Sequence, residues 1–133
     1  MDLIIETLAD INDIEDIRDL WEEVCDYCNS CQRKSSNLVI GIPKVGDTVL
    51  WHQILTKESN CFSKTKAWIQ YPPKGSVNCQ HNIITGIAVL DINNDGNGGN
   101  ADIIDGGIGR NFARIKLRSK FRKGLSFQVI IIG

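Results

Sequence analysis

Short apolar-rich stretches recur along the chain after residue 37, and within 112–121 apolar residues alternate with cations, which predicts β-strands. Clusters of Gly, Pro and Asn separate these stretches and predict turns. The predicted strands are Leu38–Ile42, Thr48–Thr56, Lys64–Tyr71, Asn82–Asp91, Asp102–Ile104, Phe112–Phe121 and Leu125–Ile132. The last ends in the aliphatic run Val129–Ile132, which indicates a strand buried on both faces. The pattern predicts a mainly β protein, an antiparallel β-sandwich or barrel-like sheet.

The N-terminal part of the chain follows the other period. Its apolar residues recur at steps of three and four, with acidic residues on the opposite face, which predicts one added N-terminal α-helix. The apolar stripe is Ile11, Ile14, Ile17, Trp21, Val24 and Cys28. Asp10 or Asn12 can cap the start, and the helix should end near Ser30. We therefore divide the chain into an acidic amphipathic helical segment, 1–34, and a β-sandwich domain, 35–133.

The net charge of −1 conceals two oppositely charged parts. Residues 1–28 hold ten acidic residues and one basic residue, which gives −9. The remainder holds fourteen basic and six acidic residues, which gives +8. At 133 residues, with 42% hydrophobic and 23% charged residues, the chain has the composition of one globular domain with a genuine core. It contains no apolar run long enough to cross a membrane.

Four cations alternate with apolar residues in one predicted strand, so they should line one face of it: Arg114, Lys116, Arg118 and Lys120. This face is either a solvated sheet surface with edge-protecting charges or a binding surface for an anionic ligand, nucleic acid, a membrane or the acidic helix. Nucleic acid is the least favoured, because no aromatic residues are interleaved in the strand and the pI is about 6.1. The candidate partner-binding residues are these four together with Ile14, Ile17 and Trp21. We expect the helix to pack on the sandwich of its own chain or of a dimer mate, shielding part of the cationic strand.

The five cysteines form an odd set: Cys25, Cys28, Cys31, Cys61 and Cys79. If two bridges form, fifteen pairings are open. We expect at least one disulfide between the Cys25–Cys31 cluster and Cys61 or Cys79, because such a bridge would staple the charged helix to a small domain.

Candidate chemistry is sparse. Residues 91–102 match the opening of a calcium loop, but the twelfth position is Asp102 instead of glutamate and the flanks are strands. A glycine-rich connection explains the same residues, so we predict no metal and no cofactor. The two histidines, His52 and His81, lie in no nucleophile or base motif, and we predict that the protein is not an enzyme.

The order of motifs in the second half resembles one family. Gly86-Ile-Ala-Val-Leu-Asp91, a cluster of Asp, Asn and Gly ending at Asn100, Gly106-Gly-Ile-Gly109, the basic strand, Lys123-Gly-Leu-Ser-Phe127 and the terminal Ile132-Gly133 follow one another. This resembles the small secreted insect proteins named after the transcription activator multiprotein bridging factor two, which include response-to-pathogen proteins. The resemblance covers roughly residues 44–133.

The resemblance implies a secreted binding protein with a protein partner and an immune, stress or host-interaction role, for example in saliva. It also implies an alternative, an intracellular transcriptional bridging module. The start Met1-Asp-Leu-Ile-Ile-Glu6 is acidic where a signal peptide carries a basic region, so we expect either a cytosolic protein or a mature form with an added start residue. The resemblance favours the mature form. A homodimer stays open.

Overall fold

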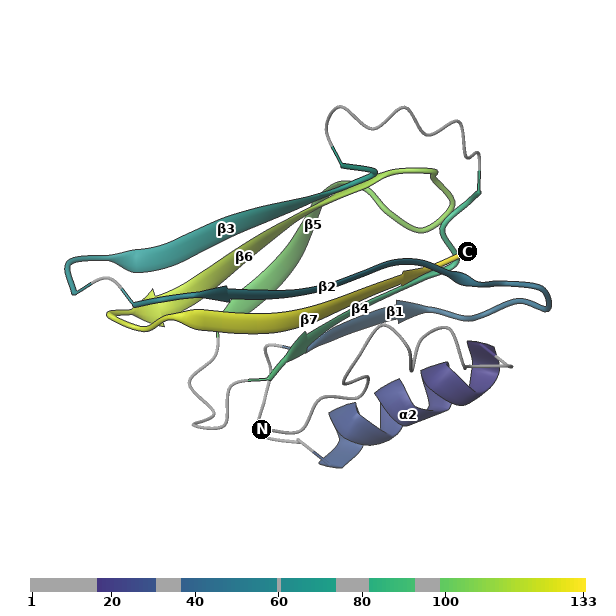
Figure 1. Ribbon diagram of the computed structural model, residues 1–133, viewed down its shortest axis with the longest axis horizontal. Coiled ribbons are helices and arrows are strands. Elements are labelled where there is room, and N and C mark those ends of the chain that lie inside the picture. Colours follow the sequence, from purple (N-terminus) through teal and green to yellow (C-terminus); the bar gives the residue numbers. More distant parts are fainter. Residues whose placement is uncertain (1–16, 31–36, 60, 74–81, 93–98) are drawn as a thin grey trace.

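The structure is a computed structural model that describes residues 17–30, 37–59, 61–73, 82–92 and 99–133. For residues 26–30 it describes the backbone only. Two antiparallel sheets face each other, and one helix lies beneath the first sheet (Figure 1). The elements are α2 (Ile17–Ser30), β1 (Leu38–Gly41), β2 (Val49–Lys57), β3 (Lys64–Tyr71), β4 (Gly86–Asp91), β5 (Asn100–Gly106), β6 (Ala113–Phe121) and β7 (Leu125–Ile132). The predicted mainly β class is confirmed, α2 is the one helix among the described residues, and the two sheets form a sandwich without closing into a barrel.

The first sheet has the strand order β1-β4-β7-β2, and the second has the order β3-β6-β5. Consecutive strands β2 and β3 therefore lie in different sheets at an edge of each. The inner faces meet in a core of aliphatic side chains with Tyr71 and Phe127. Alternation of burial along β3 and β6 follows from this arrangement, because every second side chain points into the core.

Strand β7 is buried at all eight positions, as its aliphatic run predicts. Phe127, Val129 and Ile131 belong to the core between the sheets. Ile130 and Ile132 point to the other face of the sheet, where they contact the helix cluster. A central strand needs apolar residues on both faces only when both faces are covered, and β7 meets that condition.

Helix α2 covers the outer face of the first sheet with one apolar stripe: Ile17, Leu20, Trp21 and Val24. The indole Nε1 of Trp21 donates a hydrogen bond to the Gly41 carbonyl at 3.2 Å. Leu20 was not in the predicted stripe, Ile14 lies outside the described residues, and nothing is described of the Cys28 side chain. The helix thus packs on its own chain.

The expectation that the helix shields the Arg114–Lys120 strand is wrong. Strand β6 belongs to the second sheet, whereas α2 packs on Ala88, Leu90, Ile130 and Ile132 of the first. Those side chains give the first sheet an apolar outer face, and burying them is worth more than pairing exposed charges.

Two strands, Lys64–Tyr71 and Leu125–Ile132, have the predicted bounds, but β5 is longer than the predicted Asp102–Ile104 because it pairs along most of β6. The residue before β5 must be glycine, because a Cβ at Gly99 would lie 1.3 Å from the Arg118 carbonyl oxygen. Gly107 follows it at φ +111°, a conformation that disfavours other residues.

Candidate partner-binding surface

Strand β6 places its four predicted cations on the outer face of the second sheet. Ile115 and Leu117 between them are fully buried in the core, so the intervening side chains must point outward. Arg114 and Lys120 are exposed, and Lys116 and Arg118 are half-buried. The sequence therefore predicts the facing of this strand correctly.

Strand β3 adds an aromatic residue to the same face. In the antiparallel register, Lys66 lies opposite Arg118, Trp68 opposite Lys116, and Gln70 opposite Arg114. The Trp68 side chain is 55% exposed, and the Lys116 Nζ lies 5.7 Å from the centroid of its ring. We call the outward residues Lys66, Trp68, Gln70, Arg114, Lys116, Arg118 and Lys120 the cationic face.

Trp68 is the residue that the sequence prediction missed. The basic strand by itself contains no interleaved aromatic residue, and Trp68 is distant from it in sequence. The available signal was the alternation in Lys64–Tyr71, which puts two lysines, Trp68 and Gln70 on one side. Only the pairing of β3 with β6 brings the two alternating sets together.

Strand β5 borders the cationic face with acidic residues. Asp102 lies opposite Lys116 and accepts a hydrogen bond from the Arg118 Nη2 at 3.3 Å, and Asp105 lies opposite Arg114. Asp102, the twelfth residue of the calcium-like stretch, is thus engaged by Arg118. The intervening Asn93–Gly98 lie outside the described residues. Among the residues that are described, no group of three potential metal ligands occurs.

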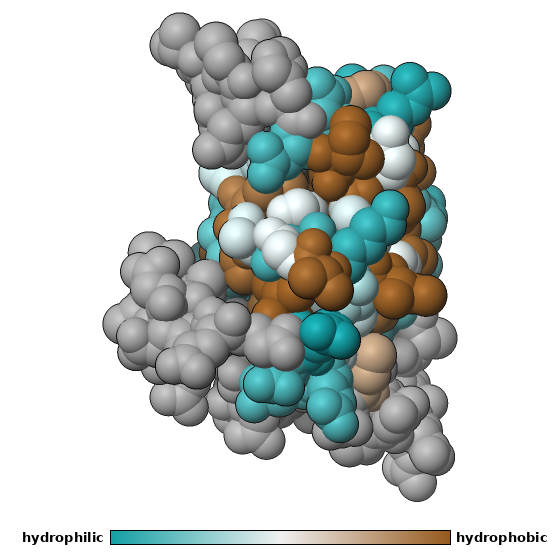
Figure 2. Space-filling model, turned by 90° about the vertical axis from the view of Figure 1, so that its right-hand side faces the viewer, coloured by the Kyte–Doolittle hydropathy of each residue, from teal (hydrophilic) through white to brown (hydrophobic). Residues whose placement is uncertain are grey.

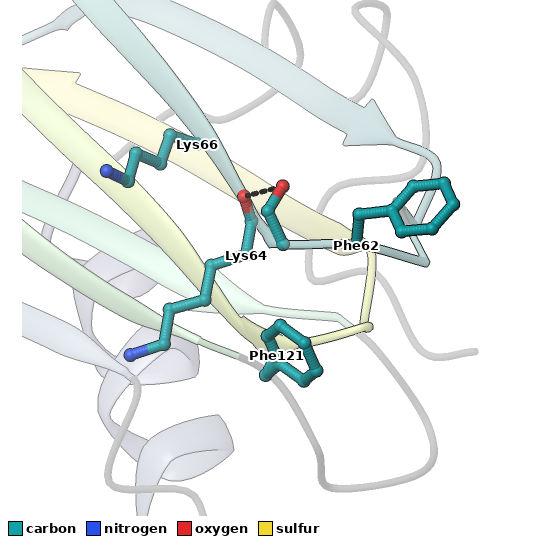
Figure 3. A pocket seen from close by; sticks show the side chains of 5 residues that line it. Phe62, Lys64, Lys66 and Phe121 are labelled. Atoms are coloured by element: carbon teal, nitrogen blue, oxygen red, sulfur yellow. Dashed lines mark hydrogen bonds between the residues drawn. The ribbon is translucent and has the colours of Figure 1, made fainter.

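A shallow hollow of about 510 Å³ continues this surface at the end where β3 begins and β6 ends. It is lined by Phe62, Ser63, Lys64, Lys66 and Phe121. Phe62 is 85% exposed, and the amine ends of Lys64 and Lys66 extend away from it (Figure 3). The Arg122 guanidinium carbon lies 5.2 Å from the Phe121 ring centroid. The hollow is therefore lined by two aromatic rings, and cationic groups lie around it.

A different surface closes the opposite end of the sandwich. Ile42, Val45, Ile83 and Ile108 are exposed there, and apolar side chains gather on this end in Figure 2. A hollow of about 320 Å³ is lined by Gly41, Ile42, Lys44, Ile83, Ile84, Thr85, Ile108 and Gly109. Exposed apolar patches mark contact surfaces, so this end is a second, chemically distinct candidate.

Cys25 and Cys61 are both free and exposed, Cys25 on α2 and Cys61 in the connection between β2 and β3. The predicted staple therefore does not use Cys61. Cys31 and Cys79 lie outside the described residues, and the Cys28 side chain is not described. A bridge from Cys28 or Cys31 to Cys79 stays a prediction.

The Gln128 side-chain amide Nε2 donates a hydrogen bond to Nε2 of His52, in β2, at 3.0 Å, and burial lowers the pKa of His52. His81 lies outside the described residues.

No helix in the described part of the chain is long and apolar enough to span a membrane.

Comparison with known proteins gives one family. The model described as Transcription activator MBF2 matches residues 40–133, which run from the end of β1 to the end of the chain. The match leaves out helix α2. No curated protein and no solved structure matches the chain.

Proposed function

This chain belongs to the Transcription activator MBF2 family, and we propose that it is a non-enzymatic binding protein whose cationic face engages an acidic region of a protein partner. The observation that carries the proposal is Trp68, a large aromatic side chain that is 55% exposed halfway along edge strand β3, beside the cations of the central strand β6. Tryptophan and arginine are the residues most enriched where interfaces concentrate their binding energy.

The two components have separate roles. Trp68 offers a flat apolar surface that a partner side chain can cover, and covering it removes apolar area from water. The surrounding amines and guanidinium groups attract carboxylates, which raises the association rate and orients the partner. A partner segment with acidic residues around an apolar anchor matches both components.

A long polyanion fits the same surface less well. Asp102 and Asp105 lie along one border of the cationic face and would repel a phosphate backbone that runs across the strands. The cationic face presents one aromatic side chain, Trp68, and the exposed rings of Phe62 and Phe121 lie apart from it in the hollow at the end of the strands, whereas single-stranded nucleic acid is usually bound by a continuous series of stacking rings.

The test is calorimetric titration with a synthetic peptide of alternating Glu and Leu residues. A peptide of equal length with Gln in place of Glu is the probe control. Trp68→Ala should weaken binding at least tenfold, and raising the salt concentration should weaken it further. Ile108→Ala, at the apolar end, is the control variant and should leave the affinity unchanged.

Two results would contradict the proposal. One is equal affinity of the parent protein and Trp68→Ala for the acidic peptide. The other is Trp68-dependent binding of heparin or duplex DNA without binding of the peptide, which would assign the face to polyanions instead of a protein.

We place this binding outside the cell, in an immune, stress or host-interaction role. The support is the resemblance of the glycine and aspartate spacing to secreted insect proteins. A transcriptional bridging role inside the cell is the second candidate. It is favoured by the description of the family and by the exposed free thiols of Cys25 and Cys61, which suit a reducing compartment.

Thiol labelling of the native protein, isolated without reductant from culture medium and from cell lysate, separates the two settings. Recovery from medium with Cys28, Cys31 or Cys79 oxidised supports secretion. Recovery from nuclei with all five thiols free supports the transcriptional role and contradicts secretion.

A further inference from the structure

The four sheet edges of the sandwich differ in how they are protected against pairing with another chain. Natural proteins protect edges with short strands, lysines, charges or bulges. Strand β1 has only four residues, and β5 carries two aspartates and an irregularity between Ile103 and Asp105. Strand β3 carries Lys64 and Lys66, and the Lys57 amine donates to the Lys66 carbonyl at 2.9 Å. Each of these edges is protected by one of the known devices.

Strand β2 has none of them over most of its length. It is nine residues long, and within the described part of the chain it forms a ladder with β7 alone. One irregularity lies between Val49 and Trp51, and from Trp51 onward the register with β7 is regular. Residues 49–56 include no charged residue, no proline and no glycine, and Ile54 is 40% exposed. An uncharged, regular edge of this length readily pairs with another strand.

We propose that the β2 edge pairs with the β2 edge of a second copy of this chain, in antiparallel orientation, to join the two four-stranded sheets across a two-fold axis. In an antiparallel pair, residues that lie opposite each other point to the same face of the sheet. A two-fold axis perpendicular to the joined sheet must therefore pass between the two copies of one residue. The regular, uncharged run is Trp51–Thr56, with Gln53 and Ile54 at its centre. An axis at Ile54 would set Lys57 opposite Trp51, whereas an axis at Gln53 keeps Lys57 outside the regular pairs.

This register is self-complementary. It sets Trp51 opposite the partner's Leu55, both on the side that packs toward the core. It sets His52 opposite the partner's Ile54 on the other side, and Gln53 opposite the partner's Gln53 on the axis. No like charges oppose one another, which is the condition for favourable cross-strand pairs. The cationic face would remain exposed, because it belongs to the other sheet.

Substitutions at Gln53 test the axis directly. Sedimentation equilibrium should give a dimer for the parent protein at tens of micromolar. Gln53→Lys alone and Gln53→Glu alone should each raise the dissociation constant at least tenfold, because identical charges then face each other. An equimolar mixture of the two variants should form a heterodimer, because opposite charges meet on the axis. Gln70→Lys, the same change on β3, should leave the dimer intact.

A monomeric parent protein overturns the proposal, as does a dimer that both Gln53 variants retain or a mixture that does not associate. Circular dichroism establishes that the variants are folded. If a Gln53 variant fails to fold, hydrogen exchange of the parent protein decides instead. The β2 amides should then be protected more strongly at high than at low protein concentration, and equal protection overturns the pairing.

Discussion

The two sheets of this sandwich share one core but treat their outer faces in opposite ways. On the first sheet the outer residues of the central strands include Ala88, Leu90, Ile130 and Ile132, and helix α2 covers them. On the second sheet the corresponding positions of the central strand are cations, and no described element packs over them. The comparison shows that side-chain chemistry on the outer face decides where the amphipathic helix packs. A face left open by this rule is available for a partner.

Tryptophan truncation on the two sheets gives the largest contrast. Trp21 is 5% exposed beneath the first sheet, and Trp21→Ala should lower the free energy of unfolding by about 3–5 kcal/mol. Trp68 is 55% exposed on the second sheet, and Trp68→Ala should lower it by less than about 1 kcal/mol. Urea denaturation monitored by circular dichroism measures both. Equal effects would mean that the outer faces do not differ as described.

The fit between helix and first sheet can be tested at Gly86. A Cβ there would lie 2.8 Å from the Trp21 ring and 2.9 Å from the Ile132 side chain, so Gly86→Ala should cost about 1–3 kcal/mol through overpacking. Combining it with Trp21→Leu should remove part of that cost, because the ring that clashes is gone. A double-mutant cycle measures this coupling, and additive effects would show that the contact with Trp21 does not cause the loss.

The strands and the helix could be predicted from the sequence because each depends on a local pattern, a period for α2 and β6 and an aliphatic run for β7. Strands β3 and β7 match the predicted bounds, and the apolar stripe of α2 is visible at steps of three and four. The face to which the helix docks could not be predicted in this way, since it depends on which strands share a sheet. The charges in the sequence predict that the acidic helix packs on the cationic strand. Burial of apolar side chains against Ala88 and Ile130 instead determines where the helix packs.

The candidate site shows the same division. The four cations of β6 follow from one alternating strand, but Trp68 joins them only through the β3–β6 register. Asp102 likewise appears in the sequence as part of a calcium-like loop, and the β5–β6 pairing sets it beside Arg118. Residues that lie together on neighbouring strands can be far apart in sequence, and the local period of each strand does not indicate which strands pair.

Acidification should lower the free energy of unfolding of the protein through His52, a residue of the first sheet. Burial lowers the pKa of His52, so the unfolded chain, with an ordinary pKa of about 6.5, binds the proton more readily than the folded protein. Stability is therefore full above pH 6.5 and declines as the pH falls through that value toward the lower folded pKa. The Gln128 amide can donate to Nε2 only while that nitrogen is unprotonated. His52→Gln should reduce this part of the decline in melting temperature between pH 7.5 and 5.5, and an unchanged slope would exclude His52 as its source.

The smallest effect on stability is expected at the ion pair of the open face. The Arg118 and Asp102 side chains are 41% and 54% exposed, so Asp102→Asn should change the free energy of unfolding by at most about 1 kcal/mol. The same substitution removes a negative charge from the border of the cationic face and should strengthen binding of the acidic Glu-Leu peptide.

Asp47→Asn is the matched control. Asp47 accepts hydrogen bonds from the Lys44 amide and the Thr85 hydroxyl at the other end of the sandwich, so its loss of charge should cost stability without changing peptide affinity. If Asp102→Asn destabilises the fold more than Asp47→Asn, the charges of the second sheet serve folding, and its outer face is a structural surface instead of a binding one.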